Sequence, residues 1–366
     1  MITAWIIGQF YGWELVNRWV LLNADPMFST SGVMPASRTF SFSDPEAYQA
    51  AIRASSIELF PTTKGDFNAE LTQIELNLLW IQRGSETLPA ISHGILTSKR
   101  AVIEFLARYD QPRYQHNGIE VSPGEIVIND WRPVHRRCFT PHHWGSMSLA
   151  LADLAAAGRA LAGEELNVPL VTRIVRPAPK LMMRLMSLHA GAVRLAKTAP
   201  EKLSHPGLVR SLEQALIYAM VRCWTEGKSV EPSQRVRSHS AVMARFEEFL
   251  VANHDQPAYL AEICAATGVS ERTLRLCCQE HLGIGPVRYL WLRRMHLARR
   301  ALMRADPRVV TVTEIASDYG FGELGRFSVQ YRALFGESPS VSLHRTADDC
   351  RQEKNRPLHL RVSDFA

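Results

Sequence analysis

Apolar and polar residues alternate over short stretches between about residues 38 and 149. The run AELTQIELNLLWIQ (69–82) alternates with period two over part of its length, as a half-buried strand does. AVIEFLARY (101–109) and EIVINDW (125–131) indicate further strands, and Asn117-Gly118 is typical of a hairpin turn. Several short strands separated by turn residues predict a small barrel or sandwich.

After about residue 149 the period becomes that of helices. Residues 149–166 are rich in alanine, and residues 177–197 and 205–227 keep apolar side chains at helical spacing. We expect these helices either to support dimerisation or to pack within their own domain. The polar stretch 227–240, with one glycine and one proline, predicts an interdomain linker.

The C-terminal part of the chain contains a degenerate repeat. Its first copy is LAEICAATGVSERTLRLCCQEHLGIGP (260–286) and its second is VTEIASDYGFGELGRFSVQYRALFGESP (312–339). Each copy has the form helix, glycine turn, helix, with Gly268 and Gly320 at the position that needs left-handed backbone. Ser270 is the expected N-cap of the helix that follows the first turn. The repeat therefore predicts two helix-turn-helix motifs.

The second copy has one extra residue in its glycine-rich turn. No Ser or Thr precedes its second helix, so Gly322 is expected as a weaker cap, with Glu323 favourable beside the helix dipole. Gly325 falls in the first turn of that helix, at a cost of about 0.5–1 kcal/mol relative to alanine. Two explanations are open: close approach of a DNA strand, or close packing against the helix that joins the two copies.

Residues 241–345 resemble the DNA-binding domain of AraC/XylS-type transcriptional regulators. The second motif of this family has the form I-A-x-x-x-G-F, an aromatic residue, then F-G-x-x-P, and it is present here as Ile315, Ala316, Gly320, Phe321, Phe327, Phe335, Gly336 and Pro339. The resemblance implies two small helical subdomains, each inserting one helix into the major groove of double-stranded DNA. It also implies RNA polymerase as a partner.

Side chains opposite the apolar face of each second helix are the candidate DNA contacts. Arg272 and Arg275 are the favoured base readers, because arginine can donate two hydrogen bonds to guanine. For any single arginine, a solvated or phosphate-only contact is the alternative. The predicted contacts on the two helices are Ser270, Arg272, Thr273, Arg275, Leu276, Gln279, Gly325, Arg326, Ser328, Val329 and Arg332.

The bridge between the two motifs is expected to be one long helix over residues 287–305. Arg293, Arg300 and Arg304 share one stripe of that helix, since their spacings of seven and four are both close to whole turns. We expect this stripe to contact DNA, with Arg300 supporting all sequences about equally. A stiff bridge would let the two recognition helices reach successive major grooves, about 34 Å apart.

Composition adds little to this interpretation. The net charge of +6 and the pI of about 9.1 permit a polyanionic partner, although coding bias is an alternative cause. Six cysteines without paired spacing fit a reducing cytoplasm. The apolar first 26 residues contain Glu14 and Arg18, which indicates a docking helix or an over-extended start rather than a signal peptide or membrane span.

Enzymatic chemistry has little support in the sequence. The segment PVHRRCFTPHHWGS gathers His135, Cys138, His142 and His143, but Pro141 is expected to interrupt the strand and no H-x-H motif with a downstream Glu follows. Nucleophile-elbow, Walker and dinucleotide fingerprints are absent. The sequence therefore predicts no catalytic residues, no metal and no cofactor.

These observations predict an α+β protein. A small β-barrel or cupin-like domain with a helical dimerisation region is expected before an all-α domain of two helix-turn-helix motifs. The predicted boundaries are an N-terminal segment of uncertain order (1–37), a sensory and dimerisation domain (38–226), a linker (227–240), the DNA-binding domain (241–345) and a flexible tail (346–366). By position and texture, the strand-rich part resembles the cupin-like sensory domain of many AraC-type regulators.

The expected function is a cytoplasmic, sequence-specific transcriptional regulator. It would act as a homodimeric activator that responds to a small-molecule effector and binds no membrane. One alternative is a DNA-binding protein whose N-terminal domain only oligomerises. Another is a cupin-type metal enzyme fused to a DNA-binding domain.

Overall fold

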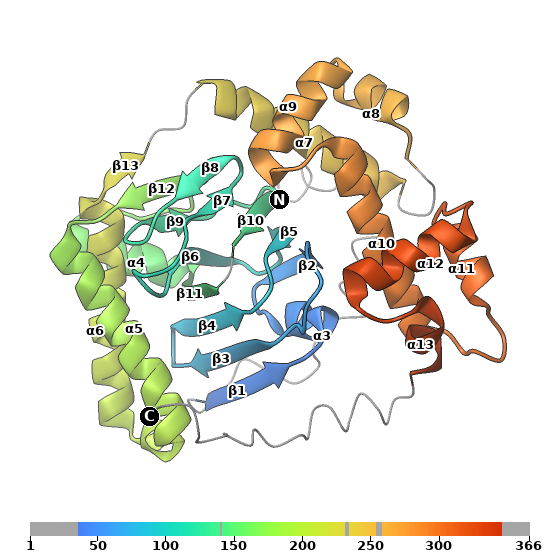
Figure 1. Cartoon of the computed structure of the whole chain (residues 1–366). Helices are drawn as coiled ribbons and strands as arrows, with labels where there is room; N and C mark the ends of the chain where they lie inside the picture. The colour runs from blue at the N-terminus through green and yellow to red at the C-terminus, as the bar shows by residue number, and fades with distance from the viewer. Residues whose placement is uncertain (1–35, 140, 231–233, 254–257, 346–366) are drawn as a thin grey trace, which may run out of the picture.

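The computed structural model describes residues 36–139, 141–230, 234–253 and 258–345 (Figure 1). A β-rich N-terminal domain is followed by an all-helical C-terminal domain, so the prediction of a mixed fold with strands first and helices last is confirmed. The predictions made for residues 1–35 and 346–366 lie outside the described residues. Within the described ranges, no helix combines the length and the hydropathy that crossing a membrane requires.

Thirteen strands are present in the described residues, and all their pairings are antiparallel. Their bounds are β1 Ala36–Phe42, β2 Ser55–Pro61, β3 Ala69–Glu75, β4 Trp80–Glu86, β5 Ala90–Leu96, β6 Arg100–Leu106, β7 Tyr114–His116, β8 Ile119–Val121, β9 Ile126–Ile128, β10 Val134–Cys138, β11 His142–Ala150, β12 Arg173–Arg176 and β13 Lys228–Val230. The larger sheet has the order β1-β3-β4-β11-β6-β9-β12-β13 and the smaller has β2-β5-β10-β7-β8. The described strands form two separate sheets, so the closed barrel of the sequence prediction is not seen.

Two hairpins show how local sequence sets these strands. Residues 69–82 form β3 and β4 rather than one strand, because the backbone turns at residues 76–79. The N–H groups of Leu78 and Leu79 donate to the Glu213 carboxylate there, which satisfies the turn. Asn117 and Gly118 adopt φ values of 49° and 76° between β7 and β8, which confirms the predicted hairpin.

Helices cover the outer face of the larger sheet (Figure 1). They are α4 (Leu151–Ala162), α5 (Pro179–Thr198), η1 (Pro200–Ser204) and α6 (Pro206–Glu226). The apolar stripes of α5 and α6 are buried in one core with the sheet, where Leu185 and Leu216 lie with Ile81 and Ile103. Packing within the domain therefore accounts for much of the apolar pattern from which dimerisation was inferred.

The two faces of the smaller sheet have different neighbours, because side chains alternate along each strand. One face closes a cavity against the larger sheet, with Tyr48 of α3 (Pro45–Ala51) and Ile52, the C-cap of that helix, at its side. The opposite face contacts the C-terminal domain: Phe60 and Ile91 belong to the hydrophobic core of that domain. The smaller sheet is thus the wall between the cavity and the C-terminal helices.

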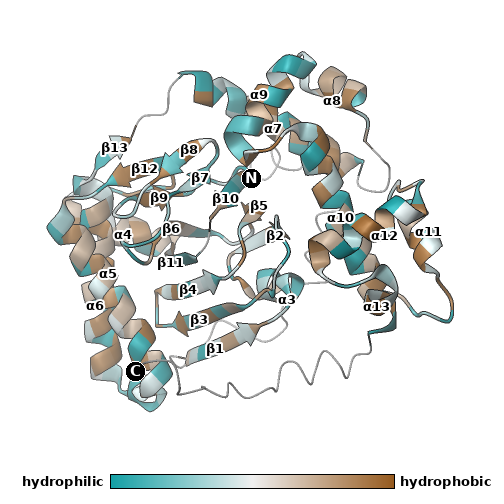
Figure 2. Ribbon diagram, viewed as in Figure 1, coloured by the Kyte–Doolittle hydropathy of each residue, from teal (hydrophilic) through white to brown (hydrophobic). Residues whose placement is uncertain are grey.

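The C-terminal domain consists of amphipathic helices, which carry hydrophobic and hydrophilic residues side by side (Figure 2). They are α7 (Gln234–Ala252), α8 (Leu260–Thr267), α9 (Glu271–Leu282), α10 (Pro286–Arg304), α11 (Val312–Asp318), α12 (Leu324–Phe335) and α13 (Pro339–His344). Their buried sides share one core, in which Phe246, Leu274, Met295 and Tyr331 are buried.

The stretch expected as a linker is largely regular structure. Lys228–Val230 form β13 at the edge of the larger sheet, and α7 begins at Gln234. The polar residues that suggested a linker occupy the exposed first turns of α7, where His239 forms an ion pair with Glu280 of α9. A polar helix start and a polar linker have similar composition, which explains the difference.

Candidate nucleic-acid interface

The first helix-turn-helix motif has the predicted turn. Gly268 ends α8 with a φ of 70°, in the left-handed region that favours glycine. The Ser270 hydroxyl accepts a hydrogen bond from the backbone N–H of Thr273 at 3.3 Å. The prediction that Ser270 is the N-cap of the second helix, α9, is confirmed.

The two faces of α9 are as the sequence predicts. Leu274 and Cys278 are fully buried in the domain core. Arg272, Arg275 and Leu276 are exposed, with 52% of Leu276 accessible, which is a large fraction for an apolar side chain. Ser270 and Gln279 are also exposed and Thr273 is partly so, and the Gln279 amide donates to the carbonyl of Gly283.

The second motif differs from the prediction at the start of its recognition helix. Gly320 has the expected left-handed φ of 76°. However, the N-cap of α12 is Glu323 and no side chain caps it, so the prediction of Gly322 as the cap is wrong. The helix begins one residue later than predicted, and the Phe321 ring before it packs against Phe327 with centroids 4.8 Å apart.

The outer face of α12 is open. A Cβ built on Gly325 meets nothing within 4 Å, so the explanation that Gly325 packs against the bridging helix is wrong. Arg326 and Arg332 are exposed, Ser328 is partly exposed and Val329 is 71% exposed. On the opposite face, Phe327 and Tyr331 are buried, as predicted.

Helix α10 joins the motifs and holds both in place. Its predicted inward residues Leu290, Met295, Ala298 and Leu302 are buried. Toward the second motif, the Trp291 indole donates to the Gln330 side chain at 2.9 Å. With 19 residues, α10 is about 28 Å long, and it places α9 and α12 at opposite ends (Figure 1). This length is close to the about 34 Å between successive major grooves on one face of DNA.

The arginine stripe of α10 lies partly against the N-terminal domain: Arg293 and Arg300 are largely buried, whereas the Arg304 side chain is 72% exposed. Arg293 and Arg300 both pair with Glu58 of β2, at 3.6 and 3.2 Å, and Arg304 pairs with Glu46 of α3. The reason is the apolar contact of α10 with Phe60, which turns this side of the helix toward the N-terminal domain. In this docked arrangement the three guanidinium groups pair with carboxylates of the N-terminal domain, and their contact with DNA stays a prediction.

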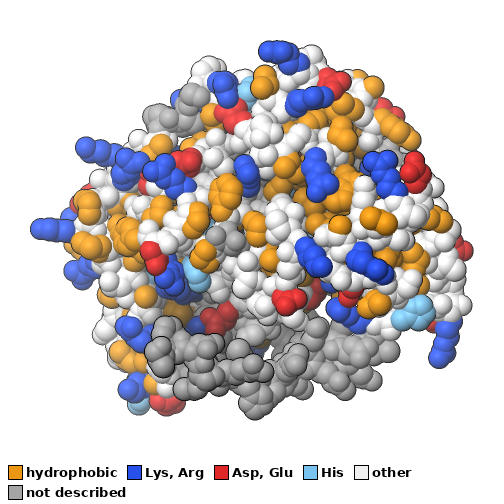
Figure 3. Space-filling model, viewed as in Figure 1, with side chains coloured by type: hydrophobic (Ala, Val, Ile, Leu, Met, Phe, Trp, Pro, Cys, Tyr) orange, Lys and Arg blue, Asp and Glu red, His pale blue; other side chains and the backbone are white. Residues whose placement is uncertain are grey.

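Basic side chains lie among hydrophobic and neutral ones on the surface over the C-terminal helices (Figure 3), and those of the helices themselves are arginines, because residues 234–345 contain no lysine. Arg275 forms an ion pair with Glu271 one turn earlier on α9. By contrast, Arg272, Arg326 and Arg332 make no ion pair with any described residue. Their guanidinium groups are therefore free to bind phosphate or guanine without breaking an internal contact.

The cavity of the N-terminal domain is a second candidate site. Its volume is about 50 Å³, and its charged and polar lining includes Glu86, Glu104, Arg136 and His142. Arg136 forms an ion pair with Glu104 at 2.6 Å. Burial raises the pKa of Glu86 to about 7, although hydrogen bonds from Tyr48 and Trp144 lower it. The cavity thus contains a carboxyl group that can change its protonation near neutral pH.

The histidines gathered by the sequence between residues 135 and 143 are separated in the fold. His135 lies on β10 in the smaller sheet, whereas His142 and His143 lie on β11 in the larger one. His135 instead lies beside His93 and Glu247, both of which are far from it in the sequence. No local sequence pattern connects these three residues, and sequence reasoning did not find them together.

Comparison with known proteins shows what the helical domain is similar to. A model described as "Helix-turn-helix domain" matches residues 263–345. The probable thc operon regulatory protein of Rhodococcus erythropolis is 44% identical over 96 residues, which cover 26% of this chain and 29% of that protein. The XylDLEGF operon transcriptional activator 2 of Pseudomonas putida is 34% identical over 103 residues, which cover 28% of this chain and 66% of that protein. The chain carries the DNA-binding domain of AraC/XylS-type transcriptional regulators.

The matches to these relatives cover about a quarter of this chain and less than a third of some relatives' own length. A second activator of the XylDLEGF operon, activator 3 of P. putida, is 36% identical over 101 residues, 30% of its length. Among solved structures, the AraC-like transcriptional activator CuxR aligns with 72% of this chain and 95% of its own, at 15% identity and a TM-score of 0.37. The family assignment rests on the sequence matches of the AraC/XylS-type domain.

Proposed function

We propose that the whole chain is a sequence-specific transcriptional activator in which each protomer reads two successive major grooves. The observation that carries this proposal is the outer face that α9 and α12 have in common. On each helix an exposed arginine that pairs with no carboxylate of the described residues, Arg272 or Arg326, lies near an exposed apolar side chain, Leu276 or Val329. Arginine reads guanine and an apolar side chain contacts the thymine methyl, so each helix has the groups needed for direct readout.

The complete chain, footprinted on genomic DNA fragments, tests this proposal. We expect protection of two short segments about one helical turn apart, because α10 fixes the distance between the recognition helices. Binding should weaken steeply with salt, since neutralised phosphates release counterions. Protection of a single segment, or affinity independent of salt, would contradict the two-groove proposal.

The N-terminal domain is proposed to be a cupin-like sensory module. Its cavity of about 50 Å³ has room for a few waters or a small polar group, and its lining offers both a cation, Arg136, and a carboxyl group, Glu86. A small polar molecule that presents both a hydrogen-bond donor and an anionic or acceptor group fits this lining. We infer that the effector belongs to this class.

The smaller sheet supplies a physical route from cavity to DNA-binding domain. On β2, Ile57 and Leu59 line the cavity, while the alternate residues Glu58 and Phe60 contact α10. A molecule that enlarges the cavity would shift β2 and with it the ion pairs of the α10 arginines. The docked arrangement would then be the effector-free state, and release of α10 would change how α9 and α12 reach DNA.

A screen of small metabolites separates this proposal from its alternatives. If DNA affinity changes with an effector, and the Arg136→Gln variant loses only that response, the sensory role is supported. A protein whose N-terminal domain only oligomerises would show no ligand-dependent change in DNA affinity, and a fused enzyme would turn the ligand over.

Assembly completes the proposal. We infer a homodimer through the outer faces of α4 to α6, together with contact to RNA polymerase at the promoter. Sedimentation and promoter-dependent transcription by purified polymerase test these two points separately.

A further inference from the structure

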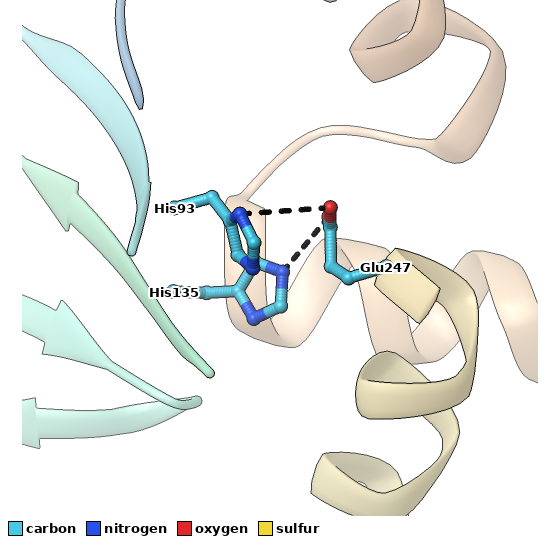
Figure 4. Close-up of side chains that lie close together, drawn as sticks. All are labelled: His93, His135 and Glu247. Carbon is cyan, nitrogen blue, oxygen red and sulfur yellow. Dashed lines mark hydrogen bonds and ion pairs between the residues drawn. The ribbon is translucent and has the colours of Figure 1, made fainter. Parts of the chain in front are cut away.

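Two histidines and one glutamate converge in the buried interface between the domains. His93 on β5 and His135 on β10 are directly opposite each other in the strand register, on the face of the smaller sheet that contacts the C-terminal domain. Glu247, on α7, lies over both imidazoles (Figure 4). The side chains of His135 and Glu247 are 3% and 2% exposed and that of His93 is 14% exposed, so water has little access to the cluster.

The separations between the ligand atoms suit a metal ion. His135 Nε2 lies 2.9 Å from Glu247 Oε1, and His93 Nδ1 lies 3.9 Å from Glu247 Oε2. One potential ligand atom from each residue lies within 4.8 Å of the other two. Tetrahedral zinc with ligands at about 2.0–2.2 Å requires neighbouring ligand atoms about 3.3 Å apart. The measured values bracket this distance, and small side-chain rotations reach it.

We propose that His93, His135 and Glu247 bind one divalent transition-metal ion of the zinc class, which joins the two domains. Two imidazoles and one carboxylate favour such an ion over Mg²⁺ or Ca²⁺, which prefer oxygen ligands. This site differs from the cavity described above, because it lies on the opposite face of the smaller sheet. The proposal is independent of the proposed regulatory function and needs neither DNA nor effector.

Neighbouring groups orient the ligands and leave the site available to a cation. The Tyr289 hydroxyl of α10 donates to Glu247 Oε1 at 3.0 Å, which fixes the carboxylate as outer partners of metal ligands do. The guanidinium group of Arg293, whose charge acts on both His93 and Glu247, forms an ion pair with Glu58 at 3.6 Å.

A bound ion would hold the domains in the docked arrangement. Two of its ligands come from neighbouring strands of the N-terminal domain and the third from the first helix of the C-terminal domain. Each ligand therefore depends on the other domain for a complete site, and separation of the domains would release the metal. The ion would act as a clamp between the cavity wall and α7.

Metal binding to the complete, EDTA-stripped chain tests the proposal. Titration with Zn²⁺ in a calorimeter, and mass spectrometry of the native protein, should show one buried site per chain with a dissociation constant in the micromolar range or tighter. Mg²⁺ and Ca²⁺ should not compete. Zn²⁺ should also raise the melting temperature by several degrees, because it binds only the folded, docked chain.

Variants of the ligands decide between a metal site and a simple hydrogen-bonded cluster. Glu247→Gln keeps the size of the side chain and can still accept the Tyr289 hydrogen bond. Loss of a group that only hydrogen-bonds to a metal ligand weakens metal binding about 10–100-fold. Glu247→Gln should weaken zinc binding by more than this, and zinc should no longer raise its melting temperature. His135→Gln should do the same, while His143→Gln on β11 should bind zinc as the unaltered chain does. Equal zinc stoichiometry and affinity in Glu247→Gln and the unaltered chain would overturn the proposal, as would a chain that binds no zinc.

Discussion

Arginines on the recognition helices and arginines on α10 differ in what they contact, although the sequence predicts DNA for both groups. Arg272 on α9 and Arg326 on α12 are exposed and make no ion pair with any described residue. Arg293 and Arg300 on α10 are largely buried and pair with Glu58 of the N-terminal domain. A stripe of arginines on a helix can therefore form ion pairs with another domain of the same chain as readily as it can bind a nucleic acid.

The partners of the α10 arginines bear on regulation, because a carboxylate can take the place of a DNA phosphate. Phosphates and carboxylates are interchangeable partners for a guanidinium group, since both accept its hydrogen bonds. The N-terminal domain therefore covers part of the basic surface with its own carboxylates in the docked arrangement. Of the two recognition helices, α9 also contacts the N-terminal domain, at β7 and β10, where the His281 ring packs against that of His135.

The largest effect is expected for Gly325→Leu on the open face of α12. The helix should remain as stable, because a Cβ at this position meets nothing within 4 Å and leucine is a better helix former than glycine by up to about 1 kcal/mol. Specific DNA binding should fall toward non-specific affinity, about 1,000-fold or more, because the added side chain collides with the duplex. Melting temperature and operator affinity, measured on the same protein, test both parts.

Gly207→Leu is the matched control for this substitution. Gly207 follows Pro206 as the second residue of α6, as Gly325 is the second residue of α12, and its Cβ direction is also open. This variant should keep both stability and operator affinity. If Gly325→Leu binds its operator normally, close approach of this helix turn to DNA is excluded.

The second largest effect is expected on the pH dependence of stability, and it concerns two carboxylates of the N-terminal domain, Glu58 and Glu86. Glu58 is paired with arginine, whereas Glu86 receives its hydrogen bonds from Tyr48 and Trp144, which are neutral. Burial raises the pKa of Glu86 from 4.5 to about 7, so the folded chain binds more protons than the unfolded chain between these pH values. Stability should therefore fall as pH rises through this window, by up to about 3 kcal/mol.

Glu86→Gln removes this titration and should give a flatter dependence of stability on pH. Urea midpoints of the N-terminal domain at pH 5 and pH 8 measure the difference. Glu201→Gln, at an exposed position on η1, should retain the slope of the unaltered chain. The same slope in Glu86→Gln and the unaltered chain would mean that Glu86 is ionised throughout.

The third effect concerns the free arginines themselves. Arg272→Ala and Arg326→Ala should each cost about 1–3 kcal/mol at the specific site and relax one position of its consensus. The two losses of binding free energy should add, because α9 and α12, which carry the two arginines, lie at opposite ends of α10. Selection of binding sites from random DNA by each variant tests the helix register, and Arg210→Ala on α6 should leave the consensus unchanged. An unchanged consensus in both groove variants would show that these residues contact only phosphate or solvent.

Local features of the fold could be predicted from the sequence, and contacts between domains could not. The turns at Gly268 and Gly320 and the cap at Ser270 depend on backbone geometry within a few residues, so their sequence signals are sufficient. The burial of Phe327 and Tyr331 follows from helical spacing alone. These predictions are confirmed because each one concerns a single helix and its nearest turn.

The orientation of α10 and the cluster at Glu247 depend on where distant segments pack. Helical spacing places Arg293 and Arg300 on one stripe, but only the position of Phe60 decides that the stripe faces the N-terminal domain. His93 and His135 meet through strand register, and Glu247 reaches them only when the domains dock. Periodicity carries no information about such contacts, which explains why the sequence revealed neither the ion pairs of Arg293 and Arg300 with Glu58 nor the cluster at Glu247.

The smallest effect is expected for Arg300→Ala, and it decides between the two uses of the α10 stripe. The ion pair with Glu58 is partly exposed, at 18% and 31% of the two side chains, so its loss should cost about 1 kcal/mol. If the pair serves docking, Arg300→Ala and Glu58→Gln should both lower the melting temperature slightly, and neither should weaken DNA binding. Their effects should also be less than additive in the double variant.

If Arg300 instead binds phosphate, only Arg300→Ala should weaken DNA binding, equally for all sequences. It should also reduce the slope of log affinity against log salt concentration by about 1. Arg113→Ala and Glu120→Gln, which break an exposed pair away from α10, should change neither the docking nor the salt slope. Because Arg300 Nη1 and Nη2 already bind Glu58 and Gln49, the second pattern would mean that Arg300 leaves these partners when the chain binds DNA.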